Sequence, residues 1–148
     1  ASRYMATWVI PYEPGTLEAV GYRAGKEVAR QGVETVDDPA KLALDADRQH
    51  IAADGDDLAY VTVEVQDKRG RHHPNAANEI RFSLTGPGEI VGVGNGDPAS
   101  LESFQANKRT AYNGRCQVVI RAKERRGKVK LTARSKGLKA AETVIRVG

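Results

Sequence analysis

The sequence has 148 residues, of which 40% are hydrophobic and 28% are charged, and this composition is typical of a globular chain rather than a disordered one. The formal net charge is +4, and no apolar run approaches the ~20 residues that a membrane helix needs, so we expect no membrane span. A single cysteine, Cys116, excludes an internal disulfide and a zinc site made of thiolates. The first residues, "ASRYMATW", lack the features of a signal peptide, and we interpret the chain as part of a longer protein.

Residues 1–36 contain three strand-like runs, Thr7 to Tyr12, Thr16 to Tyr22 and Lys26 to about Val36. Three strands of this length rarely form a stable unit alone. The segment "VDDPA" at 36–40 interrupts the pattern and predicts a domain boundary. We therefore expect residues 1–36 to expose apolar faces or unpaired edges, which dock on a neighbouring module or pair with a second copy of the chain.

From Pro39 onwards, seven runs alternate apolar and polar residues with period two, and turn-forming residues separate them. This pattern is typical of an antiparallel β-sandwich, so the sequence predicts an all-β fold over residues 37–148. The apolar positions of each strand face one side and predict the core. The predicted core residues are Leu42, Leu44, Val61, Val63, Val65, Ile80, Phe82, Leu84, Val118, Ile120, Val129, Leu131 and Ile145.

The stretch "GEIVGVGNGDPASLESF" places a strand, a glycine-rich turn and a helix-like start in the order of a phosphate-binding loop. The residue three positions after Gly94 is Asp97, whose carboxylate would repel a phosphate, and the sequence contains no G-K-[ST]. We therefore expect no nucleotide. The glycines instead predict a tight structural corner, a short helix capped by Asp97, and a loop through Arg109 that crosses between the two sheets. The predicted corner consists of Gly92, Gly94, Asn95 and Gly96.

The densest basic group, "KERRGKVK" at 123–130, lies between two alternating runs. We interpret these runs as two strands of a hairpin joined by a charged turn. No aromatic residue is interleaved that could stack on bases, so we predict a solvated tip and no nucleic-acid partner.

Two groups of side chains contain residue types that bind metals. Five aspartates suggest calcium, but the spacing of a calcium loop with its closing glutamate is absent, and acidic turns explain them better. His72 and His73 are adjacent, so on a strand they would point in opposite directions and not share a metal. The aspartates are Asp45, Asp47, Asp54, Asp56 and Asp57.

The sequence shows no clear catalytic or sugar-binding group. Glycoside hydrolysis needs two carboxylates that flank the bond, and nothing singles out such a pair. Cys116 precedes an apolar strand and is expected to be a buried, inert thiol. The aromatic residues, 5% of the chain, form no predicted platform for a glycan: Trp8 suits a strand face and Tyr112 leads into a strand. We therefore assign no catalytic, cofactor-binding or metal residue and no cofactor, and leave the substrate-binding residues unassigned. The carboxylates considered are Glu13, Glu18, Glu64, Glu79, Glu89 and Glu102.

Four segments in order, "WVIPYEPGTLEAVGYRAGKEV", "LALDADRQHIAADGDDLAYVTVEVQDKRG", "GEIVGVGNGDPASLESF" and "RTAYNGRCQVVIRA", resemble the carboxy-terminal region of bacterial β-galactosidases of glycoside hydrolase family 2. The resemblance covers nearly the whole chain. It implies immunoglobulin-like modules that follow a catalytic (β/α)₈ barrel. Residues 1–36 then resemble the closing strands of one module, and residues 37–148 resemble a complete following module.

The barrel and its two catalytic glutamates would lie upstream of this sequence. The resemblance therefore implies a non-catalytic accessory segment that supports or positions the barrel, with the remainder of the parent glycosidase as its partner. It also implies a periplasmic or secreted location. Two alternatives stay open: a carbohydrate-binding module, and an adhesin-type structural module resembling those of invasin.

Overall fold

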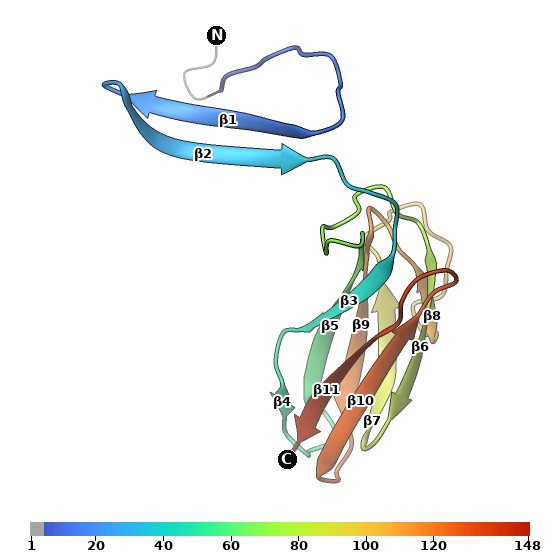
Figure 1. The fold of residues 1–148 in the computed structure, drawn as a ribbon. Coiled ribbons are helices and arrows are strands. Elements are labelled where there is room, and N and C mark those ends of the chain that lie inside the picture. Colours follow the sequence, from blue (N-terminus) through green and yellow to red (C-terminus); the bar gives the residue numbers. More distant parts are fainter. Residues whose placement is uncertain (1–4) are drawn as a thin grey trace. The chain divides into compact units, whose positions relative to one another are not determined.

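The computed structural model describes residues 5–148, and every regular element among them is a β-strand (Figure 1). The expected all-β fold is therefore confirmed, and the described residues include no helix that could cross a membrane. The chain divides into two units, one that ends at Thr35 and one that runs from Val36 to Gly148.

The first unit contains an antiparallel hairpin of β1 (Thr16–Arg23) and β2 (Lys26–Glu34). The two-residue turn between the strands has positive φ at Ala24 (50°) and Gly25 (78°), and this combination matches the twist of paired strands. Almost every side chain of the two strands is exposed. The hairpin alone therefore has no core of its own.

The third strand predicted in this unit, Thr7 to Tyr12, is wrong, because residues 5–13 form no strand. The run contains Pro11, which has no N–H to donate to a strand ladder, and Pro14 follows shortly after it. The alternation of apolar residues thus predicted a strand at a position where Pro11 cannot donate a hydrogen bond to a neighbouring strand.

The second unit has two sheets (Figure 1). One contains five strands in the order β4-β11-β10-β6-β8, and the other contains four strands in the order β3-β5-β9-β7. Neighbouring strands pair antiparallel, except β4 and β11, which are parallel. The strands are β3 (Lys41–Ala46), β4 (His50–Ile51), β5 (Leu58–Gln66), β6 (Glu79–Thr85), β7 (Gly88–Gly94), β8 (Lys108–Thr110), β9 (Arg115–Ala122), β10 (Gly127–Arg134) and β11 (Ala141–Val147).

The inward-facing side chains of both sheets form one apolar cluster. Every predicted core residue belongs to it or packs against it; only Leu44 and Leu84 are partly rather than fully buried. Burying one side chain of this size stabilises the fold by about 1.5–3 kcal/mol. The period-two pattern thus identified the residues that hold the two sheets together.

The predicted hairpin around the basic group is wrong in its pairing. β9 lies in the four-stranded sheet and β10 in the five-stranded sheet, so residues 123–126 connect two sheets rather than two paired strands. Alternation shows which side chains face inward, but it carries no information about which strand is the neighbour. The connecting residues are exposed, as expected for a charged turn.

Asp67 is a fully buried carboxylate at the end of β5. Its oxygens accept hydrogen bonds from the Arg71 backbone N–H (2.9 Å), from the Arg71 guanidinium (2.6 Å) and from the Asp37 backbone N–H (3.2 Å). Arg71 also contacts the Asp37 carboxylate at 2.8 Å. This network fixes the turn after β5 to the start of the second unit.

The Asp67 network predicts a loss of stability in acid. Burial alone would raise the pKa of the carboxyl, but the hydrogen bonds from Arg71 and Asp37 lower it from 3.8 to about 2. Because the folded-state pKa lies below the unfolded one, this stabilisation is complete above about pH 4 and is lost as the pH falls towards 2. Urea unfolding at pH 6 and pH 3 should show a smaller pH effect in Asp67→Asn than in the unchanged chain. Equal pH effects in the two proteins would contradict this assignment.

Candidate functional site

Residues 95–107, here called the crossing loop, connect β7 of the four-stranded sheet to β8 of the five-stranded sheet. The loop thus crosses between the sheets as the sequence predicted. At its start, Gly96 has a left-handed φ of 75°, whereas Gly94 does not. Gly92 and Gly94 lie within β7, so of the four residues predicted to form the corner only Asn95 and Gly96 lie in the loop, and the backbone turns at Gly96.

The short helix predicted after this corner is wrong. Asp97 does accept a backbone hydrogen bond, from the N–H of Ala99 at 2.9 Å, but the segment is a turn. Ser100 Oγ accepts the N–H of Glu102, and Ser103 Oγ accepts the N–H of Gln105. Such local bonds from serine side chains give the backbone an alternative to helical pairing.

The two glycines at the corner predict a contrast. Gly96→Ala should lower the free energy of unfolding by about 1 kcal/mol, because an L-residue resists the left-handed region. Gly94→Ala is the matched control: an added Cβ meets open space at both positions, but Gly94 is not left-handed, so the change should stay within about 0.5 kcal/mol. Denaturant unfolding measures both. A loss at Gly94 as large as that at Gly96 would contradict the prediction.

Arg109, at the centre of β8, holds the crossing loop from inside the molecule. Only 1% of its surface is exposed. Its guanidinium donates to the Glu102 carbonyl (3.0 Å) and to Asn95 Oδ1 (2.8 Å), lies 3.5 Å from the Glu102 carboxylate, and stacks 4.9 Å from the centre of the Phe104 ring. Thr110 donates its hydroxyl to Glu102, and its carbonyl accepts from Asn95. We call Asn95, Glu102, Phe104, Arg109 and Thr110 the Arg109 anchor.

The Arg109 anchor presents an apolar tip to solvent. Leu101 is fully exposed and Phe104 is 66% exposed, although the backbone carbonyls of Glu102 and Phe104 both accept hydrogen bonds, from Arg109 and from the Val93 N–H. The sequence drew attention to the loop but not to the burial of Arg109. An arginine next to Lys108 in a polar segment gives no signal that distinguishes a buried side chain from a surface one.

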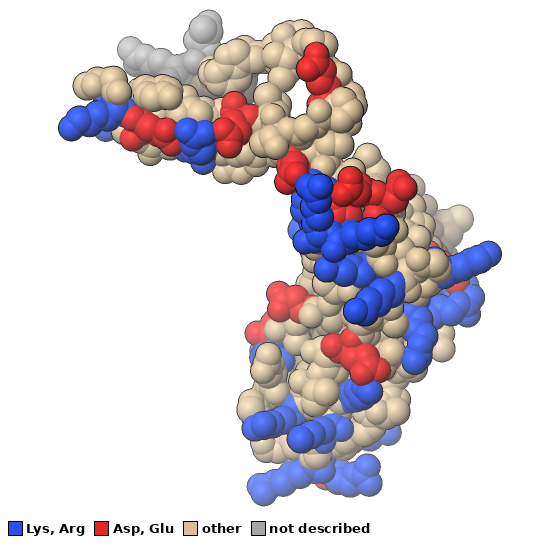
Figure 2. All heavy atoms as spheres, in the orientation of Figure 1, with Lys and Arg blue, Asp and Glu red and all other residues tan. Residues whose placement is uncertain are grey.

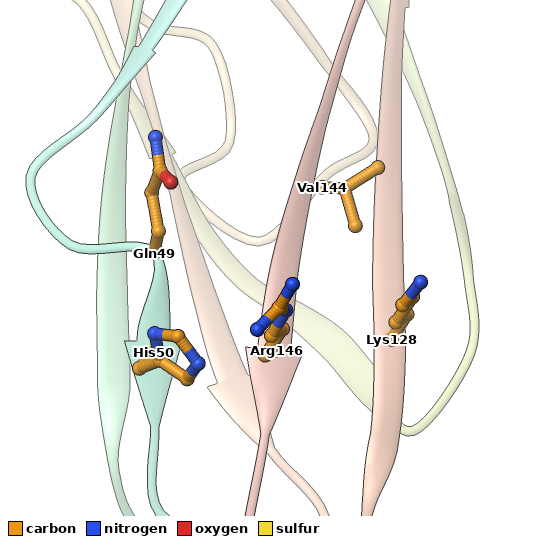
Figure 3. Close-up of a pocket in the computed structure, with 5 residues that line it drawn as sticks. All are labelled: Gln49, His50, Lys128, Val144 and Arg146. Carbon is orange, nitrogen blue, oxygen red and sulfur yellow. The ribbon is translucent and has the colours of Figure 1, made fainter.

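The outer face of the five-stranded sheet carries a row of basic residues, His50, Arg146 and Lys128, on the neighbouring strands β4, β11 and β10 (Figure 3). Arg146 pairs in register with both of the other two residues. With Gln49 and Val144 they line a shallow pocket in which no lining residue is acidic. Figure 2 shows lysine and arginine gathered over this part of the second unit. The row is a place where an anionic group would meet cations without a competing carboxylate.

The outer face of the four-stranded sheet carries a mixed polar cluster around Glu64. Its carboxylate accepts hydrogen bonds from Arg115 Nη2 (2.6 Å) and Gln66 Nε2 (3.0 Å), and His72 Nδ1 lies 3.5 Å away. Partial burial would raise the pKa of Glu64, but the bonds from Gln66 and Arg115 hold it below its usual value. Gln66 and His72 form an isolated antiparallel bridge, which brings His72 close to Glu64 although the two residues are eight positions apart in the sequence.

Of the five candidate calcium ligands, Asp45 lies in β3 and the other four lie in turns and loops outside the strands. Asp54 Oδ1 accepts the backbone N–H groups of Asp56 and Asp57, and these bonds lower the pKa of Asp54. Asp57 accepts from the Ala52 N–H at 2.7 Å, and Asp47 accepts from the Tyr60 N–H at 2.9 Å. Among residues 5–148, no three His, Cys, Asp or Glu side chains come together as metal ligands. Asp47, Asp54 and Asp57 thus each accept a backbone hydrogen bond within the fold.

Cys116 is 3% exposed, and burial raises the pKa of its thiol to about 12, against the smaller opposing effect of Arg109. We predict that a disulfide-exchange reagent at pH 8 reacts with the native chain at least ~100-fold more slowly than with the urea-unfolded chain. Glutathione treated in parallel calibrates the reagent. Rapid reaction of the native protein would show that the thiol is accessible and ionised.

The aromatic side chains of the second unit lie on different elements. Phe82 is in the core as predicted, Tyr60 on β5 is 39% exposed, and Tyr112 before β9 is 41% exposed. Phe104 is held over Arg109. In the first unit, Trp8 is 71% exposed, in a segment that forms no strand. These side chains do not combine with the polar clusters above into one site.

Comparison with known proteins gives two family matches. Residues 42–144 match the glycoside hydrolase family 2 C-terminal domain 5, and residues 1–29 match a domain of unknown function, DUF4982. Beta-galactosidase BoGH2A from Bacteroides ovatus is 45% identical over 134 residues, which are 90% of this chain and 16% of that protein. Two further relatives, a beta-galactosidase and a beta-glucuronidase, are 32% and 29% identical.

Solved structures also show similarity to family 2 glycoside hydrolases. A glycosyl hydrolase family 2 member from Bacteroides cellulosilyticus superimposes with a TM-score of 0.91 at 39% identity, over 94% of this chain and 18% of that chain. A C-terminal fragment of intimin superimposes with a TM-score of 0.53 at 19% identity, over 73% of this chain and 33% of the fragment, which indicates a shared fold alone. The chain thus spans about one sixth of the length of BoGH2A.

Proposed function

The chain belongs to the C-terminal domain 5 region of glycoside hydrolase family 2, and from this premise we propose that it is a non-catalytic accessory segment of a β-galactosidase-like enzyme. Its role is to support or position a catalytic barrel that lies outside the sequence. The observation that carries this proposal is the extent of the match: the aligned segment fills 90% of this chain but only 16% of BoGH2A.

The second unit, in this proposal, is a complete immunoglobulin-like sandwich, and residues 1–36 are the closing strands of a preceding domain. Two observations support the division. The two family matches, at 1–29 and 42–144, do not overlap. The β1–β2 hairpin leaves Leu17, Tyr22, Val28 and Val33 between 52% and 65% exposed, as expected of strands whose partners belong to the rest of a domain. Self-association through these residues is the alternative when the rest of that domain is missing.

The proposal is tested by comparing the β-galactosidase activity of this chain with that of the polypeptide encoded by the complete reading frame. The purified 148-residue chain should not release nitrophenol from nitrophenyl β-galactoside, whereas the polypeptide encoded by the complete reading frame should. Hydrolysis by the chain alone would overturn the accessory role. A reading frame that contains only further sandwich domains would support the adhesin-type alternative.

Location and glycan binding belong to the same proposal. We place the parent protein in the periplasm or outside the cell on family resemblance alone, and fractionation of cells that express the intact protein tests this. A pull-down of the chain on insoluble polysaccharide separates the accessory role from a carbohydrate-binding module. Retention on the polysaccharide that survives 0.5 M salt, about where simple charge attraction is screened, would favour the binding module.

A further inference from the structure

The tip of the crossing loop combines exposed apolar side chains with a fastened backbone. Leu101 and Phe104 are exposed, yet the loop that carries them is fastened by a buried arginine. Leu101 is 101% exposed, so its side chain contributes no packing to the second unit. Ordering a surface loop costs conformational entropy, and the hydrogen bonds of the Arg109 guanidinium to Asn95 and Glu102 offset this cost in the crossing loop.

The chemistry of the tip is uncharged. Residues 98–106 read "PASLESFQA", and the single charged side chain, Glu102, is directed to Arg109 and Thr110 in the anchor. In a chain whose residues are 28% charged, this leaves an apolar and neutral surface. Depletion of charge with an aromatic and an aliphatic anchor is typical of the centre of a protein interface.

We infer that Leu101 and Phe104 form a docking contact with an apolar surface of the parent hydrolase, in the part of the polypeptide that precedes this C-terminal segment. The inference rests on the proposed function and names the surface through which the accessory segment acts. The occupant follows from the comparisons: the matched domain is a C-terminal one, and 84% of BoGH2A lies outside the aligned segment (100% less the aligned 16%). The Arg109 anchor holds the tip ready for that contact.

Thiol labelling at the tip tests the inference in the intact polypeptide and in the 148-residue chain. Leu101→Cys places a thiol on a side chain that makes no internal contact, and the only other thiol of the chain, Cys116, is buried. Val144→Cys is the control, because Val144 is 46% exposed on the outer face of β11. Peptide mass spectrometry after timed alkylation gives the labelling rate at each position.

Labelling at position 101 is expected to be at least ~10-fold slower in the intact polypeptide than in the isolated chain, with less than about a twofold change at position 144. Equal rates at position 101 in the two proteins would overturn the docking contact. Equal slowing at both positions would also count against it, because a general effect of the larger polypeptide would explain it.

A second variant separates the remaining outcomes. Leu101→Asp should leave the unfolding midpoint of the isolated chain unchanged and lower that of the intact polypeptide. If the isolated chain forms a dimer that Leu101→Asp dissolves, the occupant is a second copy and the inference is wrong. If the reading frame encodes no hydrolase barrel, both the proposed function and the inference are wrong. If it encodes a barrel but position 101 is labelled as fast in the intact polypeptide as in the isolated chain, only the inference is wrong.

Discussion

Replacing Gly114 with alanine is expected to destabilise the chain by more than about 4 kcal/mol or to prevent it from folding. Gly114 has a φ of 74° and follows Asn113, whose φ is 49°, in a two-residue turn between Tyr112 and Arg115. A Cβ atom at Gly114 would lie 2.1 Å from the carbonyl oxygen of His73. Two unfavourable terms therefore add at this position: the left-handed backbone and a clash with main-chain atoms.

The backbone around Gly114 cannot move aside to relieve this clash. Its N–H donates to the Ala76 carbonyl at 2.9 Å, and its own carbonyl accepts from the Val65 N–H at 2.8 Å. Gly137→Ala is the matched control, because Gly137 has a φ of 78° and an added Cβ there meets open space. We expect about 1 kcal/mol for Gly137→Ala, so the difference between the variants isolates the clash. Soluble yield and denaturant unfolding give the result, and similar losses in the two variants would contradict it.

The alternation of apolar residues predicted the strands and the core because inward positions of a half-buried strand repeat every second residue. The same pattern could not predict which strands pair, so β9 and β10 were assigned to one hairpin although they lie in different sheets. It also could not detect β4 or β8, which have two and three residues and are too short to show a period. Pairing and short strands are set by contacts between distant segments.

The candidate site was less predictable for the same physical reason. The glycines and Asp97 indicated a turn at the start of the crossing loop, and that turn exists. The features that give the loop its fixed shape are contacts of Arg109 with residues 14 and 7 positions earlier in the chain. A sequence shows neither that this arginine is buried nor that Leu101 is exposed, because both depend on the path of the loop between the two sheets.

Removing the Arg109 guanidinium is the second change with a large expected effect. Arg109→Met keeps an unbranched apolar stem but removes the guanidinium, and so leaves the Glu102 carbonyl, Asn95 Oδ1 and the Glu102 carboxylate without their cationic partner. Loss of a buried charged donor costs about 3–5 kcal/mol when its partner stays buried. The Glu102 side chain is 31% exposed and can regain water, so we expect about 2–4 kcal/mol here.

Arg121→Met is the control for Arg109→Met, because Arg121 pairs with Glu89 on the surface, where the two side chains are 45% and 43% exposed. Its loss should cost less than about 1 kcal/mol. Denaturant unfolding compares the two variants, and hydrogen exchange of residues 97–106 should become faster only in Arg109→Met. A loss no larger than that of Arg121→Met would show that the buried guanidinium does not hold the crossing loop. With both the energetic loss and faster exchange, Leu101 would remain exposed but would no longer be fixed in position, and position 101 in the intact polypeptide should lose its protection from labelling.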